Sequence, residues 1–131
     1  MYVKTVDMFG AFREIEIIDK TKLPDGGKMQ SICKIIIEDP NLNGPTFFKE
    51  GVMSQAAMNK VSQNVGANKR DAALLIEKCK NLGFDVETIK PKKDKNKKKG
   101  KINHEEFVLK TKFDSRCSQH ARDAAMLIFG R

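Results

Sequence analysis

The chain contains few of the residues that mark several large classes of protein. Its 131 residues include no tryptophan, one tyrosine, three cysteines and two histidines. Cys33, Cys79 and Cys117 are odd in number and widely spaced, which argues against the disulfide framework of a small secreted domain. Two histidines, His104 and His120, are too few for a histidine-rich metal site. The sequence therefore favours reduced thiols, with Cys33 and Cys79 in the core because they lie within apolar patterns. We expect neither a metal nor a cofactor.

Long apolar runs are also missing. No stretch approaches the roughly 18–20 apolar residues that a membrane-spanning helix needs, and the N-terminus lacks the apolar core of a signal peptide. The overall composition, 40% hydrophobic and 32% charged with eight phenylalanines, is that of a globular chain. We expect a cytoplasmic protein without a membrane partner. Its length fits a single domain over residues 1–131.

The charge of the chain is concentrated in one short stretch. The whole sequence carries 25 Lys and Arg against 17 Asp and Glu, a formal net charge of +8. Residues 90–101, KPKKDKNKKKGK, hold eight lysines and one aspartate, which is +7 of that total. We call this stretch the lysine segment. The rest of the chain is left with +1, so the basic character belongs to one segment and not to a whole surface.

Alternating apolar and polar residues predict strands in the first third of the chain. The predicted strands are residues 3–8, 12–18 and 29–37. Pro24-Asp25-Gly26-Gly27 has the residues of a tight turn, because Asp bonds its own backbone and Gly accepts a positive φ.

Helical spacing follows, over residues 52–65 and 68–82, and the first of these helices is predicted to stop near Gly66. Asn68 and Gly83 are the predicted N-terminal and C-terminal caps of the second helix. Residues 86–89 and 107–113 are then predicted to form a hairpin with the lysine segment as its tip. A last helix is expected from Asp114 or Ser115 to Gly130. The predicted fold is thus α+β, order β-β-β-α-α-β-β-α, with an antiparallel sheet of about five strands packed on three helices.

The lysine segment predicts non-catalytic, sequence-independent binding of DNA or RNA through phosphate contacts. It contains neither an aromatic residue nor an arginine, so it would hold a backbone without reading bases. The predicted contact residues are Lys92, Lys93, Lys95, Lys97, Lys98, Lys99, Lys101, Arg116 and Arg122. An equally weighted alternative is a solvated basic loop that only keeps a sheet edge from pairing with other chains.

A second hypothesis is a small regulator or assembly component that binds another protein. The lysine segment would then contact an acidic surface, or Leu74 and Met126, which lie off the apolar faces of their helices, would enter a groove of the partner or of a second copy in a homo-oligomer. The alternative for these two residues is ordinary packing or ordinary exposure. A small enzyme using Glu14, Glu16 or Cys117 ranks third, and no catalytic residue is predicted.

A short repeat connects the two helices that carry Leu74 and Met126. The run RDAALLI at residues 70–76 recurs as RDAAMLI at residues 122–128. The residues before each copy do not match, so similar helix chemistry is favoured over duplication.

Overall fold

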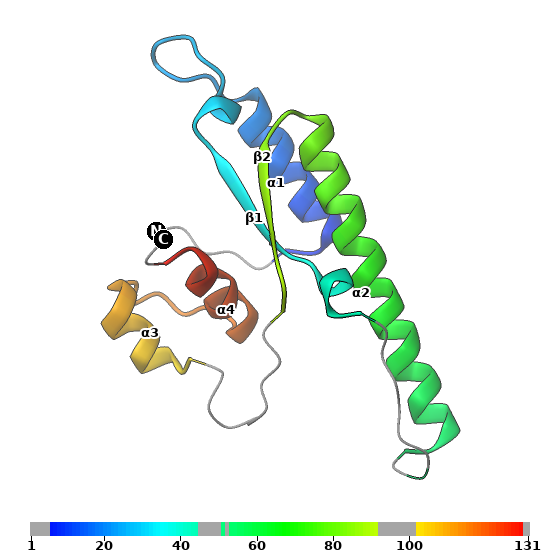
Figure 1. The fold of residues 1–131 in the computed structure, drawn as a ribbon. Coiled ribbons are helices and arrows are strands. Elements are labelled where there is room, and N and C mark those ends of the chain that lie inside the picture. The colour runs from blue at the N-terminus through cyan, green and yellow to red at the C-terminus, as the bar shows by residue number, and fades with distance from the viewer. Residues whose placement is uncertain (1–5, 45–50, 52, 92–101, 130–131) are drawn as a thin grey trace. The chain divides into compact units, whose positions relative to one another are not determined.

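The structure is a computed structural model that describes residues 6–44, 51, 53–91 and 102–129. Backbone contacts divide the chain into two compact units, Met8–Pro91 and a second formed by Met1–Asp7 with Lys92–Arg131. Each unit is described by itself. The elements, drawn in Figure 1, are α1 (Met8–Lys20), η1 (Met29–Ser31), β1 (Lys34–Glu38), η2 (Pro40–Asn43), α2 (Gln55–Asn81), β2 (Asp85–Ile89), α3 (His104–Thr111) and α4 (Gln119–Ile128).

The predicted antiparallel sheet of about five strands is wrong. The described residues form four helices and one two-stranded sheet in which β1 and β2 run parallel. The register places Lys34 opposite Asp85 and Glu38 opposite Ile89, and the amide of Asp39 donates to the carbonyl of Ile89 at 2.8 Å. Parallel strands cannot be joined by a tight turn and need a long crossover, which α2 provides.

The core of the Met8–Pro91 unit forms where α1, α2 and one face of the strand pair meet. Its buried side chains are Ile15, Ile37, Cys79 and Phe84, and half-buried apolar side chains surround them. Ile35, Ile37 and Val86 share this face because side chains alternate along a strand. Burial of each such side chain contributes about 1.5–3 kcal/mol. One strand of the predicted set, residues 29–37, is thereby observed in part, as β1.

The strand predicted at residues 12–18 is wrong, because these residues lie in α1. Of the strand predicted at residues 3–8, the structure describes residues 6–8, of which Met8 begins α1 and the other two have no regular structure. Ile15 and Ile17 alternate with Glu14 and Glu16 and so resemble a strand. Ile15 is buried, whereas Ile17 is 60% exposed, so the apparent alternation does not follow the buried face. Ile15 and the half-buried Ile18 both join the core, and their spacing of three residues is helical.

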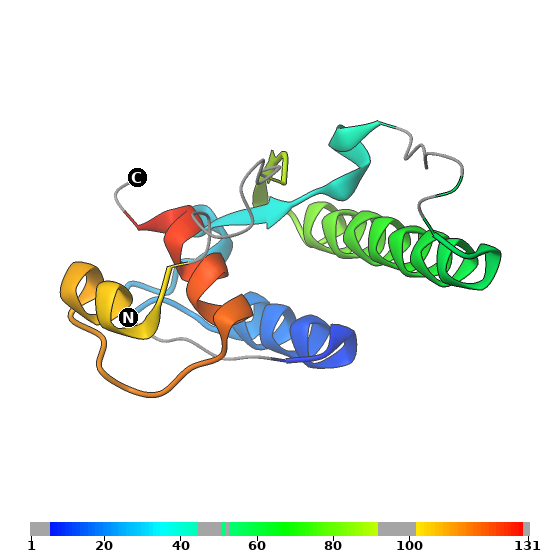
Figure 2. The ribbon, with the colours of Figure 1, turned by 90° about the horizontal axis from the view of Figure 1, so that it is seen from below.

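Helix α2 is a single helix of 27 residues and does not break at Gly66 (Figure 2). The predicted cap Asn68 lies inside it, and the observed N-cap is Ser54, whose hydroxyl accepts from the amide of Ala57 at 3.3 Å. At the other end the predicted cap is confirmed. Gly83 has φ +85°, its amide donates to Lys80 at 2.9 Å, and the amide of Phe84 donates to Cys79 at 3.1 Å. These two bonds form a Schellman motif.

The predicted hairpin strand at residues 107–113 is also wrong, because most of it belongs to α3. Asn103 caps this helix by accepting from the amide of Glu106 at 2.7 Å, and Lys112 ends it with φ 60°. The rings of Phe107 and Phe113 meet edge to face at 6.2 Å, and Phe107 is fully buried. Among the described residues of this unit, the buried apolar side chains are Phe107 and, from α4, Ala121 and Ala125.

Two smaller predictions have clear outcomes. The turn at residues 24–27 is confirmed: Gly26 has φ +84° and the side chain of Asp25 accepts from the amide of Gly27 at 2.9 Å. The repeated heptapeptides both lie in helices but bury different positions. Ala125 is buried, whereas its counterpart Ala73 is exposed. The two copies thus pack through different positions.

Within the described residues, no helix is both long and apolar enough to cross a membrane.

The continuity of α2 through Gly66 and its end at Gly83 predict opposite effects of two alanine substitutions. Added Cβ atoms at both positions meet nothing within 4 Å, so the backbone decides the outcome. Gly66→Ala should raise the free energy of unfolding by about 1 kcal/mol, because Gly is a poor residue inside a helix. Gly83→Ala should lower it by about 1–2 kcal/mol, because alanine is strained at positive φ. Urea denaturation measures both, and a destabilising Gly66→Ala would contradict an unbroken α2.

Candidate nucleic-acid and protein-binding residues

The lysine segment connects β2 to α3 in the chain and is not the tip of a hairpin, since residues 104–111 are helical. The predicted contact residues from Lys92 to Lys101 lie outside the described residues. Its neighbours in the sequence are nearly free of net charge. Residues 8–89 carry eleven basic and eleven acidic side chains, and residues 102–129 carry four of each. The excess positive charge therefore lies between two charge-balanced stretches.

Arg122 is held by its own helix. Its guanidinium donates to the carbonyl of Cys117 at 2.6 Å and to Oε1 of Gln119 at 2.9 Å, while its Nε is buried without a hydrogen-bond partner. Arg116 is exposed in the connection between α3 and α4. The two predicted arginines thus differ in environment. Arg116 is open to solvent, whereas Arg122 could contact a phosphate only through N–H groups that these two hydrogen bonds do not use.

The N-terminal turn of α4 is fixed to the start of α3 by Gln119. Its side-chain amide donates to the carbonyl of Ile102 at 3.1 Å and to the carboxylate of Asp123 at 2.8 Å. Ser118 caps α4 by accepting from the amide of Ala121 at 3.1 Å. Gln119 therefore links the first described residue after the lysine segment to the helix that carries Arg122.

The predicted protein-binding residues lie in different units. Leu74 is 46% exposed on the outer side of α2, and Met126 is half-buried on α4. Leu74 thus has the surface position that the second hypothesis requires, while Met126 is partly covered.

Of the residues considered for catalysis, Glu16 is in an ion pair, while Glu14 and Cys117 are half-buried; the other two cysteines belong to the core. Cys79 is fully buried, as predicted for a core residue, and burial raises the pKa of its thiol. Cys33 packs against the same core. The Glu16 carboxylate accepts from Nζ of Lys78 at 2.8 Å, and this bond and the charge of Lys78 lower the pKa of Glu16. Among the described residues, no three His, Cys, Asp or Glu side chains are grouped to hold a metal ion.

Sequence reasoning missed a pocket at the carboxyl ends of the two strands. It has a volume of about 380 Å³, opens to solvent, and is lined by Glu38, Pro40, Asn68, Asp71, Ala72 and Pro91. Ligands of α/β sheets commonly bind at this edge. The pocket exists because β1 and β2 pair in parallel, which places their carboxyl ends at the same edge. The predicted hairpin paired residues 86–89 with 107–113 instead, so it gave no reason to expect the lining residues of the pocket near one another. Pro91, which lines this pocket, belongs to the lysine segment.

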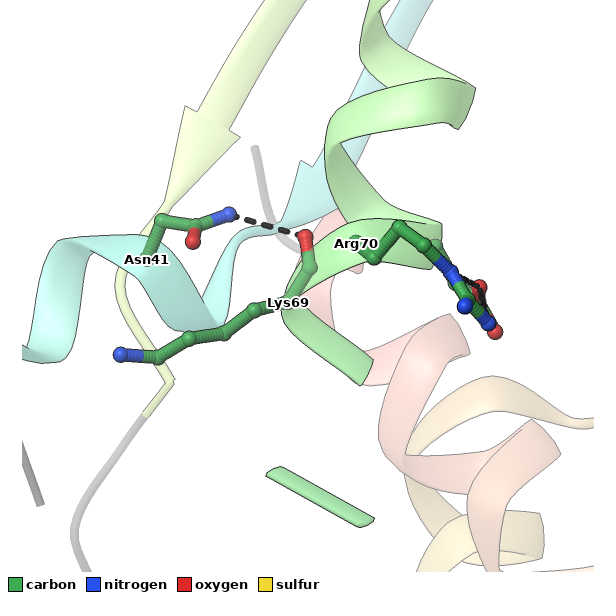
Figure 3. A network of polar contacts seen from close by, with 4 residues as sticks. Asn41, Lys69 and Arg70 are labelled. Atoms are coloured by element: carbon green, nitrogen blue, oxygen red, sulfur yellow. Dashed lines mark hydrogen bonds and ion pairs between the residues drawn. The ribbon is translucent and has the colours of Figure 1, made fainter. Parts of the chain in front are cut away.

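A polar network joins η2 to α2 beside the pocket (Figure 3). The side chain of Asn41 donates to the carbonyl of Lys69 at 3.0 Å, and Nζ of Lys69 donates to the carbonyl of Gly44 at 3.0 Å. Arg70, on the next position of α2, pairs with Asp71 at 3.3 Å. These bonds tie η2 to α2 beside the pocket, whose lining combines two acidic residues and one amide with Pro40, Ala72 and Pro91.

The chain matches no family model, and neither the curated proteins nor the solved structures contain a similar protein by these comparisons.

The bonds of Arg122 predict a structural cost for its loss that Arg116 does not share. Arg122→Gln removes two hydrogen bonds from a charged donor and should lower the free energy of unfolding by about 1–3 kcal/mol. Arg116→Gln, at an exposed position, should change it by less than about 0.5 kcal/mol. Urea denaturation measures both values. Equal stability of the two variants would contradict the anchoring role of Arg122.

The ion pair between Glu16 and Lys78 predicts a pH dependence. Because the pKa of Glu16 is lowered in the folded protein, its charge stabilises the fold above the unfolded-state pKa, and this stability is lost as the pH falls through the folded-state pKa. Lys78→Met should raise the pKa of Glu16 toward its ordinary value, as measured by NMR titration of the carboxyl carbon. Lys80→Met, two residues along α2, is the control and should leave it unchanged.

Proposed function

We propose that the protein binds nucleic acid without sequence preference and without catalysis, through phosphate contacts from the lysine segment. The observation that carries this proposal is the confinement of +7 to residues 90–101. A run of lysines at this density attracts a polyanion, and each phosphate that it neutralises releases counterions.

The distribution of charge supports the lysine segment as the principal contact. The flanking residues 8–89 and 102–129 each contain equal numbers of basic and acidic side chains, so neither stretch has an excess of positive charge. Arg116 is exposed, and among the described arginines it lies closest to the lysine segment in the sequence. It is therefore the first candidate for an additional phosphate contact. The proposed mode is therefore a local electrostatic one, and it requires no fixed fit between a folded surface and a groove.

The side chains of the lysine segment determine whether it can distinguish one base sequence from another. Lysine contacts phosphate as a point charge, whereas base recognition uses arginine forks or amides, and tolerant single-strand binding uses aromatic stacking. Residues 90–101 contain no arginine and no aromatic residue, and Asn96 is their single amide side chain. Affinity should consequently follow the charge density of the polyanion and depend strongly on salt.

The second candidate function is binding to another protein, either an acidic surface through the lysine segment or a groove through Leu74 and Met126. The 46% exposure of Leu74 favours it. We further propose a cytoplasmic location, supported by three cysteines that all remain free thiols.

Neutralising part of the lysine segment tests the proposal. Replacing Lys95, Lys97, Lys98 and Lys99 with Gln should weaken binding to a 20-base-pair duplex at least tenfold at low salt. It should also reduce the salt slope by about four, because each phosphate contact contributes about 0.9 to it. Fluorescence anisotropy at several salt concentrations measures both quantities. Circular dichroism should show unchanged helix content.

A matched control replaces four lysines outside the segment, Lys20, Lys22, Lys60 and Lys80, with Gln. This variant has the same net charge and should bind more tightly than the segment variant. Equal affinity of the two variants for the duplex would mean that binding depends on net charge alone, which would contradict the proposal. Binding of polyglutamate as tightly as the duplex, at matched charge, would favour the acidic protein surface instead.

A further inference from the structure

The outer face of α1 bears an exposed stripe of apolar and basic side chains. Within this helix the fully exposed positions are Phe9, Arg13, Ile17 and Lys20. Their spacing of four, four and three residues places them on one side of the helix, along about 16 Å. Phe9 is 71% exposed and Ile17 is 60% exposed. We call these four residues the α1 stripe.

The stripe takes no part in the core of its unit. Ile15 and Ile18, on the other side of α1, supply the contacts with the strands and α2. Single exposed apolar residues are ordinary, but two large ones at one helical face, with a basic residue between them, form an amphipathic surface. Polar residues at positions 9 and 17 would serve the fold equally well.

The acidic side chains of α1, Glu14, Glu16 and Asp19, are half-buried, whereas the charged residues at its exposed positions, Arg13 and Lys20, are both basic. Glu16 pairs with Lys78 at 2.8 Å, and Asp19 accepts a hydrogen bond from the side chain of Gln30. The guanidinium of Arg13 and the ammonium of Lys20 therefore give the stripe a positive sign. A surface that combines two apolar side chains with two basic ones is complementary to a segment with apolar and acidic side chains at matching intervals.

We propose that the α1 stripe is a docking surface for an acidic amphipathic helix of another protein. The apolar side chains of the partner would cover Phe9 and Ile17, and its carboxylates would pair with Arg13 and Lys20. A second copy of this chain is a poorer occupant of the stripe, because two copies of the stripe bring like charges together. A nucleic acid is poorer too, because Ile17 offers no ring on which a base can stack.

A designed peptide tests the proposal on the full-length protein. The probe is a fluorescent 16-residue helix with Leu at every fourth position and Glu on both sides of that row. Its scrambled form has the same composition and charge but no apolar row. Fluorescence anisotropy should show saturable binding of the probe and at least tenfold weaker binding of the scrambled form. No preference between the two would overturn the proposal.

Substitutions locate the binding. Phe9→Ser and Ile17→Ser should each weaken binding of the probe at least fivefold and leave the melting temperature unchanged, because both side chains are exposed. Leu109→Ser is the matched control: Leu109 is 70% exposed on α3, and its loss should leave binding unchanged. Arg13→Glu should weaken binding of the acidic probe and strengthen binding of a version with Lys in place of Glu. Unchanged affinities in Phe9→Ser and Ile17→Ser would overturn the proposal.

Two further arms distinguish other occupants of the same stripe. Affinity of Phe9→Ser for a single-stranded oligonucleotide and flotation of Phe9→Ser with vesicles of one-quarter phosphatidylserine should both equal those of the unchanged protein. A selective loss in either arm, with peptide binding intact, would assign the stripe to nucleic acid or to an anionic lipid surface and would contradict the proposal.

Discussion

The parallel pairing of β1 with β2 is the constraint on which the Met8–Pro91 unit depends. Two parallel neighbours require the chain to return to the starting end of the sheet, and a helix is the usual means. Helix α2 makes this return, and its C-terminal half contributes Leu75, Ile76 and Cys79 to the core. The Schellman motif at Gly83 then turns the chain so that Phe84 is buried and β2 starts opposite Lys34. One glycine thus connects the end of the helix to the register of the sheet.

Local chemistry could be predicted from the sequence, but strand pairing could not. The glycine cap at Gly83, the turn around Gly26 and the core position of Cys79 each depend on residues close in the chain or on one residue's apolar context. The direction of β1 relative to β2 depends on contacts across about fifty residues, and no local pattern encodes it. The assumed hairpin followed from treating consecutive strand-like segments as neighbours. Because this hairpin was assumed, the pocket at the carboxyl ends of β1 and β2 was not predicted.

The separation of charge along the chain has a physical consequence for folding. Like charges within a compact body repel and destabilise it, whereas balanced stretches avoid this cost. Residues 8–89 and 102–129 are each balanced, and the ion pairs of Lys78 with Glu16 and of Lys34 with Glu87 are examples of local compensation. The lysine segment was located from sequence alone because net charge is a sum over residues and needs no knowledge of pairing. The contacts of Arg122 needed coordinates, because they depend on how α4 begins.

The two helices mistaken for strands share a feature that connects the errors to the surface of the protein. In α1, Ile17 completes an apparent alternation with Ile15, and in α3, Leu109 does the same with Phe107. In both pairs one residue is buried and the other is at least 60% exposed. A helix selected only for packing would place a polar residue at the exposed position, and the helical period would then be plain. The apolar residues that obscure the period are therefore those that the core does not use. Such local inconsistencies are expected where a surface serves something other than folding.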